Sequence, residues 1–97
     1  MNTIPLLAGA SNAHQRFTIQ LGDNNLEFIV NYVTTIGPAW SVDVYRNGTL
    51  LITGAMLEPG AEISANYEAG IGRLIFVGAP VTLDNLGLDN QLVWTAE

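Results

Sequence analysis

The side chains able to do nucleophilic chemistry are few in this sequence, and they form no known catalytic motif. His14 is the only histidine, and the chain contains neither cysteine nor lysine. A hydrolase triad would require His14 to activate Ser11, Ser41 or Ser64, yet no nucleophile-elbow sequence surrounds these serines. We therefore interpret His14 as a solvated loop residue and expect no nucleophilic catalysis.

Acid–base chemistry would have to come from the nine acidic residues, which are spread along the chain. A glycosidase would use two carboxylates on either side of its substrate, and Glu27 with Asp43 is one conceivable pair. No spacing or motif selects this pair over the others. We interpret Asp43 as a solvated residue beside a hairpin and expect that the protein is not an enzyme.

Oxygen donors cluster in residues 84–90, which read Asp-Asn-Leu-Gly-Leu-Asp-Asn. Such donors suit a hard cation such as Ca²⁺, but the segment lacks the order of an EF-hand loop and its terminal bidentate glutamate. Turns have the same composition, and the absence of cysteine removes thiolate zinc sites. The interpretation we favour is a plain loop, and we expect no metal and no cofactor.

Charge limits the classes of partner. The formal net charge is −6, and the only cations are Arg16, Arg46 and Arg73, which are far apart in the sequence. Nucleic-acid affinity comes largely from neutralised phosphates, and anionic membranes attract clustered basic residues. We therefore expect no direct nucleic-acid or membrane binding. The start of the chain has no basic segment of the kind that opens a signal peptide, and we expect a soluble protein.

Charged residues make up only 12% of the chain, against about 25% in typical soluble domains. A domain of 97 residues has a large surface for its volume and normally covers it with charge. The deficit predicts a subunit that buries part of its surface in an assembly. The alternative, a monomer solubilised by Asn, Thr, Ser and Gln, remains open.

Alternating apolar and polar residues predict strands over 15–21, 26–33, 40–45 and 91–95. Asn47-Gly48 predicts a type I′ hairpin turn, because both residues accept a positive φ. A two-residue loop then sets the strand register. The expected pairs on one face are Arg46 with Thr49, Val44 with Leu51 and Val42 with Thr53, and on the other Tyr45 with Leu50 and Asp43 with Ile52.

Three further segments need an interpretation. Residues 61–69 suit a strand, a loop or a short helix, and the flanking glycines favour an extended segment or loop. The mostly apolar run 73–77 predicts a strand buried on both faces. Residues 78–89 are rich in turn formers.

The predicted fold is all-β, a small antiparallel sandwich or partly open barrel of six to seven short strands. We predict a single domain over residues 14–97, preceded by an N-terminal arm over residues 1–13. The arm lies outside the alternating strands and contains Pro5 and small residues. We expect that removing residues 1–10 spares folding.

Several motifs in order resemble the small baseplate plug family of contractile-tailed phages, of the cyanophage type. The resemblance begins at Ile4-Pro5-Leu6, covers the strands in residues 17–32, and continues through the hairpin 42–48 and the turn 57–60. It ends with Gly72-Arg73-Leu74-Ile75-Phe76-Val77, Leu86-Gly87-Leu88 and Leu92-Val93-Trp94, and so spans nearly the whole chain.

The resemblance implies a structural virion protein of the phage tail baseplate that plugs or lines the central channel and has no catalytic residues. The implied partners are hub, tail tube and spike proteins, and we expect copies to form a symmetric ring. The alternative is a carbohydrate-binding sandwich for host attachment, with exposed aromatic residues stacking on sugars. The candidate interface residues are Ile4, Pro5, Leu6, Leu7, Tyr45, Arg46, Tyr67 and Trp94.

Overall fold

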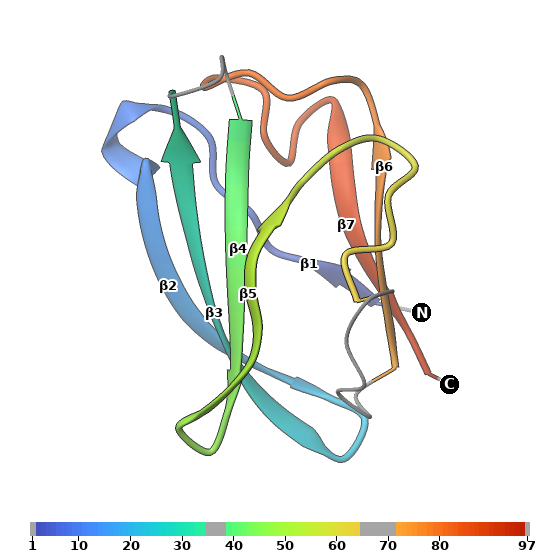
Figure 1. The fold of residues 1–97 in the computed structure, drawn as a ribbon. Coiled ribbons are helices and arrows are strands. Elements are labelled where there is room, and N and C mark those ends of the chain that lie inside the picture. Colours follow the sequence, from blue (N-terminus) through green and yellow to red (C-terminus); the bar gives the residue numbers. More distant parts are fainter. Residues whose placement is uncertain (1, 35–38, 65–71, 97) are drawn as a thin grey trace.

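The computed structural model describes residues 2–34, 39–64 and 72–96, and within them the chain forms two antiparallel sheets (Figure 1). No helix among these residues is long and apolar enough to cross a membrane. A single turn of 3-10 helix spans Ala10–Asn12. The strands are β1 (Asn2–Ile4), β2 (His14–Leu21), β3 (Asn24–Val33), β4 (Ala39–Arg46), β5 (Thr49–Met56), β6 (Arg73–Gly78) and β7 (Asn90–Thr95).

The larger sheet has the strand order β2-β3-β4-β5, and the smaller has the order β1-β7-β6. Each neighbouring pair in the larger sheet is consecutive in the chain, so this sheet is a meander. The smaller sheet joins the two ends of the chain, because β1 pairs with β7. The sheets do not close into a barrel, and the predicted all-β antiparallel sandwich is confirmed.

The hydrophobic core lies between the two sheets. Alternate residues of a strand face the same side, which places one row of apolar side chains from each strand in the core. Trp40 and Phe28 are among the largest of the fully buried side chains. The buried apolar residues are Ile4, Leu21, Leu26, Phe28, Val30, Trp40, Val42, Val44, Ile52, Leu57, Ile63, Leu74, Phe76, Leu86, Leu92 and Trp94.

The β4–β5 hairpin turns as predicted, with φ of 52° at Asn47 and 80° at Gly48. The two pairs nearest the turn are confirmed, Arg46 with Thr49 and Tyr45 with Leu50. The other three predicted pairs are wrong. Val44 lies opposite Ile52 rather than Leu51, Val42 lies opposite Ala55 rather than Thr53, and Asp43 does not pair with Ile52.

The cause is an irregular β5, which contains two register shifts. Each shift places an extra β5 residue against β4, as in a β-bulge. At the second shift Gly54 has a φ of 62°, and its N–H donates a 2.6 Å hydrogen bond to Oδ1 of Asp43. Asp43 therefore holds the bulge, whereas the sequence indicated a solvated residue.

β6 is buried on one face only, so the prediction of burial on both faces is wrong. Leu74 and Phe76 face the core, while Ile75 is half-buried and Val77 is 41% exposed. The reason is that the fold has two layers, and no third layer of described residues covers the outer face of the smaller sheet.

An extended segment lies along the outer edge of β6. The N–H of Gly60 donates to the carbonyl of Phe76 at 2.7 Å, and Ile63 N–H donates to Leu74 at 2.8 Å. Glu62 forms a bridge to Ile75. Residues 61–62 are thus extended, as one of the open alternatives had it, and residues 63–64 form a turn; the remainder of the 61–69 stretch lies outside the described residues.

The first residues pack against the rest of the chain. β1 pairs with β7, and Ile4 is only 2% exposed in the core. Further along, the N–H of Gly9 donates to the carbonyl of Leu83 at 2.7 Å. The division into an arm over residues 1–13 and a domain over residues 14–97 stays a prediction about how the segment behaves in the assembly.

We expect Gly48→Val to lower the free energy of unfolding by about 1–2 kcal/mol, because a β-branched side chain disfavours a positive φ. No heavy atom lies within 4 Å of a Cβ built at Gly48, so the cost comes from the backbone and not from a clash. Thermal denaturation measures the effect, with Thr49→Val as the control. An unchanged melting temperature would show that the turn tolerates other backbone angles.

Candidate interaction surface

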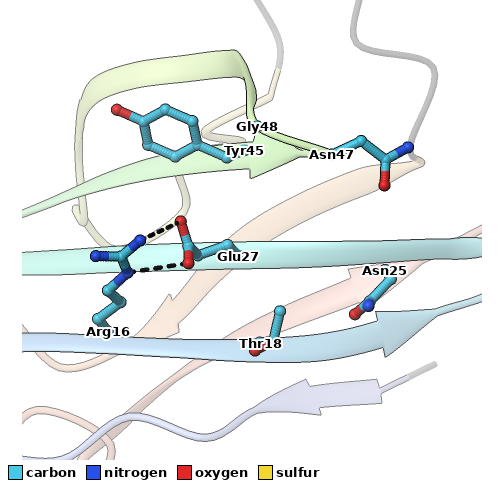
Figure 2. A pocket seen from close by; sticks show the side chains of 7 residues that line it. All are labelled: Arg16, Thr18, Asn25, Glu27, Tyr45, Asn47 and Gly48. Carbon is cyan, nitrogen blue, oxygen red and sulfur yellow. Dashed lines mark hydrogen bonds and ion pairs between the residues drawn. The ribbon is translucent and has the colours of Figure 1, made fainter.

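A polar pocket of about 340 Å³ lies on the outer face of the larger sheet (Figure 2). Its side chains come from β2, β3, β4 and the turn between β4 and β5. The lining residues are Arg16, Thr18, Asn25, Glu27, Tyr45, Asn47 and Gly48.

The strand register explains why these side chains meet. Glu27 is the central residue, because it lies opposite Thr18 on β2 and opposite Tyr45 on β4. Residues directly opposite in an antiparallel pair have Cβ atoms about 4.5–5.5 Å apart, on the same face of the sheet. The Asn47-Gly48 turn borders the pocket at the end of β4.

Arg16 and Glu27 form the principal ion pair of the pocket. Nε of Arg16 donates to Oε2 of Glu27 at 2.9 Å, and Nη2 donates to Oε1 at 3.2 Å (Figure 2). The hydrogen bond and the charge of Glu27 together raise the pKa of the Arg16 guanidinium above its ordinary value. The two side chains are 64% and 31% exposed, and exposed pairs contribute little to stability. The consequence is local, because the ion pair holds the Arg16 side chain over β3.

Each carboxylate of the conceivable pair has a partner of its own. Glu27 is bonded to Arg16, and Asp43 accepts the Gly54 N–H. The two residues lie on neighbouring strands, since Glu27 is opposite Tyr45 and Asp43 is opposite Ile29. The absence of catalysis by this pair stays a prediction.

His14 is the first residue of β2 and is exposed. Its Nδ1 is in hydrogen-bond contact with Oδ1 of Asn31, and Asn31 in turn lies opposite Ser41. His14 and Ser41 are therefore two strands apart, about 10 Å at the usual strand spacing. The third serine, Ser64, is buried and accepts the Leu74 N–H at 3.1 Å. Ser41 is thus two strands from the histidine and Ser64 is bonded to β6, while Ser11 lies in the 3-10 turn Ala10–Asn12 that precedes β2.

The side-chain oxygens of residues 84–90 hold the loop itself together. Oδ1 of Asn85 accepts the Thr82 N–H at 2.7 Å, and Oδ1 of Asn90 accepts the Gly87 N–H at 2.8 Å. Among the described residues no group of three or more metal-ligating side chains comes together. The two asparagine amides thus bond within the loop, and the absence of a bound cation stays a prediction.

The candidate interface residues do not gather at one place. Ile4 and Trp94 are in the core, Leu6 packs against it, and Pro5 and Leu7 are exposed. Tyr45 lines the pocket, and Arg46 donates to Oδ1 of Asn24 at 3.2 Å. Tyr67 lies outside the described residues. Their contact with partners stays a prediction.

Sequence reasoning missed most of the pocket, although a signal for it exists. The alternation in residues 15–21 and 26–33 places Thr18 and Glu27 on outward faces, and Asn47-Gly48 fixes the end of β4. Two registers, that of β2 with β3 and that of β3 with β4, were needed to bring Thr18, Glu27 and Tyr45 together.

The whole chain matches one family of known proteins. A family model described as "Cyanophage baseplate Pam3 plug gp18" matches residues 1–97. No curated protein matches the chain.

Proposed function

Since the match covers the whole chain, the protein belongs to the cyanophage baseplate plug family, and we propose that it plugs or lines the central channel of the tail. The family places the protein in the virion baseplate as a structural component that interacts with other baseplate components. The whole-chain match is the observation that carries the proposal. The proposal goes beyond the family in three respects: the position of the protein in the channel, the proteins that it contacts and the number of copies.

Surface chemistry supports the position in the channel. A chain with 12% charged residues has too little charge to make all of its surface strongly hydrophilic, and burial against neighbours in an assembly removes that requirement. The net charge of −6 also repels nucleic acid. A plug of this charge keeps DNA from adhering to the channel wall.

We infer further that copies form a symmetric ring and contact hub, tube or spike proteins. Closed rotational symmetry lets each copy bury one patch against its neighbour and another against the surrounding shell. Such burial accounts for the low charge of a small domain without requiring a larger core.

The test is a density map of the intact virion together with mass spectrometry of purified particles. The expected result is density for this fold on the tail axis, with repeated copies around it. Density outside the tail, or a chain absent from purified particles, would overturn the proposal.

A non-catalytic role predicts that His14→Ala leaves infectivity unchanged within twofold. The side chain is exposed, and within the described residues it is in hydrogen-bond contact with Asn31, so folding is expected to persist. Plaque titre of the variant phage measures infectivity, and thermal denaturation of the purified chain controls for folding. A large loss of titre with normal folding would indicate a chemical role for the imidazole.

Carbohydrate binding is a second candidate function, favoured by the pocket. Tyr45 there stands beside amide, hydroxyl and charged groups from Asn25, Asn47, Thr18 and Glu27, and sugar sites combine an aromatic ring with convergent polar groups. Binding of the isolated chain to a glycan array distinguishes this function from a purely structural one.

A further inference from the structure

Among the described residues, the two sheets have four edge strands, and three are unsuited to accept another strand. β1 has only three residues. β5 has two register shifts, and bulges of this kind disrupt an edge. β6 is covered by residues 60–63, which bond to its backbone. Natural sheets protect their edges in these same ways.

The remaining edge strand, β2, is regular and long. Its eight residues pair with β3 without a register shift, and β3 is its only strand partner in the described part of the chain. In Figure 1 it forms the outer limit of the larger sheet.

One hydrogen bond fixes which backbone groups of β2 face outward. The N–H of Tyr32 donates to the carbonyl of Ala13 at 2.7 Å, directly before β2 begins. Antiparallel partners alternate between bonded and non-bonded pairs, so the odd-numbered residues of β2 bond to β3. The N–H and C=O groups of the even-numbered residues therefore point to the open edge; these are His14, Arg16, Thr18 and Gln20.

The side chains of β2 leave this edge accessible. The strand has no lysine, proline or acidic residue, which are common guards of exposed edges. Its one full charge, Arg16, is held towards β3 by Glu27 (Figure 2). On the inner face Phe17 and Ile19 are half-buried and pack against the core, so an added strand would complete their burial.

We propose that β2 accepts an extended strand from another baseplate protein, which adds to the larger sheet as a fifth strand. Main-chain hydrogen bonds to the four even-numbered residues supply the pairing. The incoming strand alternates apolar residues, which cover Phe17 and Ile19, with polar residues on the outer face. These polar residues need no charge, because Arg16 is already paired with Glu27 and β2 has no carboxylate.

Because β2 is the one unprotected edge among the described residues, we expect the added strand to come from a different protein and not from a second copy of this chain. Two β2 strands would pair by twofold symmetry, and such a pair closes at two copies. A head-to-tail array of copies would need a second unprotected edge. The described residues offer none, because β1 is short, β5 is bulged and β6 is covered. The identity of the partner as a baseplate protein rests on the proposed function.

Thr18→Pro tests the proposal. The proline removes an N–H that faces the open edge and not β3, so the β2–β3 ladder keeps its bonds while the added strand loses one and meets the ring. Thr18→Val is the matched control, because it keeps the N–H and the β-branched shape. Quantitative mass spectrometry of purified virions is expected to show at least tenfold less Thr18→Pro chain per particle, and wild-type amounts of Thr18→Val.

Hydrogen exchange on the wild-type chain gives a second measurement that does not depend on the folding of a variant. The amides of Arg16, Thr18 and Gln20 are expected to exchange at least tenfold more slowly in virions than in the isolated chain. Equal exchange rates, or Thr18→Pro present at wild-type levels, would overturn the proposal.

Two other outcomes separate the alternatives. A concentration-dependent dimer of the isolated chain that Thr18→Pro abolishes would identify a second copy as the occupant and overturn the proposed partner. Absence of the wild-type chain from particles would instead overturn the proposed function and leave the open edge without a baseplate partner.

Discussion

Deletion of residues 1–10 is expected to leave the isolated chain largely unfolded at room temperature. The deletion removes β1, which pairs with β7, and the core residue Ile4, which is 2% exposed. It also removes Leu6 and Ala8, which pack against the core. Truncating one buried isoleucine to alanine costs about 2–5 kcal/mol, and small domains have a total stability of about 5–15 kcal/mol. Losing the whole segment is therefore expected to remove most of the free energy of unfolding.

Urea denaturation followed by tryptophan fluorescence measures this effect, since Trp40 and Trp94 are both in the core. Ile4→Ala is expected to cost about 2–5 kcal/mol, whereas Thr3→Ala, an exposed change on the same strand, is the matched control with a small effect. This expected result is the opposite of the expectation from the sequence, that truncation spares folding, and the measurement decides between the two. A truncated chain with a cooperative transition near that of the wild type would restore residues 1–13 as a separable arm.

Gly78→Ala is expected to destabilise the fold by about 2–4 kcal/mol, through an unfavourable φ together with overpacking. Gly78 ends β6 opposite Asn90, with a φ of 114°. A Cβ there would lie 2.6 Å from both Cα of Asn90 and the carbonyl oxygen of Asp89. Because both atoms belong to the backbone, the β6–β7 connection itself must move.

Gly60→Ala separates the two causes. Gly60 also has a positive φ, 82°, but no heavy atom lies within 4 Å of a Cβ built at this position. The Gly60 variant is expected to cost about 1 kcal/mol, from the backbone conformation alone. Melting curves of both variants give the comparison, and equal losses would show that close packing against Asn90 contributes nothing.

The larger sheet was predictable because each of its strands pairs with a strand that is next to it in the sequence. Alternation in β2 and β3, and the Asn47-Gly48 turn, identify strands whose partners are consecutive in the chain. The inward rows of β3 and β4 follow from the same alternation. Phe28 and Trp40 are buried as that pattern requires.

What could not be predicted depends on partners distant in the sequence. The second bulge of β5 forms because Asp43 bonds to the N–H of Gly54, and an alternating pattern does not indicate such a bond. β1 has three residues, too few to show alternation, and its partner β7 is at the other end of the chain. The single-sided burial of β6 depends on the number of layers, which an apolar run does not specify.

The pocket was missed for a related reason. Each of its residues is an ordinary polar surface residue of a strand or turn, and only the register across three strands brings them together. The bond between Arg16 and Glu27 joins neighbouring strands at a diagonal, which requires the hairpin register to be known first.

The pairing of β1 with β7 also bears on how the protein folds during synthesis. The β2–β5 meander consists of contacts between consecutive strands, and such contacts form early because they close short loops. β1 is made before the meander but pairs with β7, which is made after it. We expect the nascent chain to hold a partly formed sandwich with an exposed inner face until β7 has been made, so the smaller sheet assembles last.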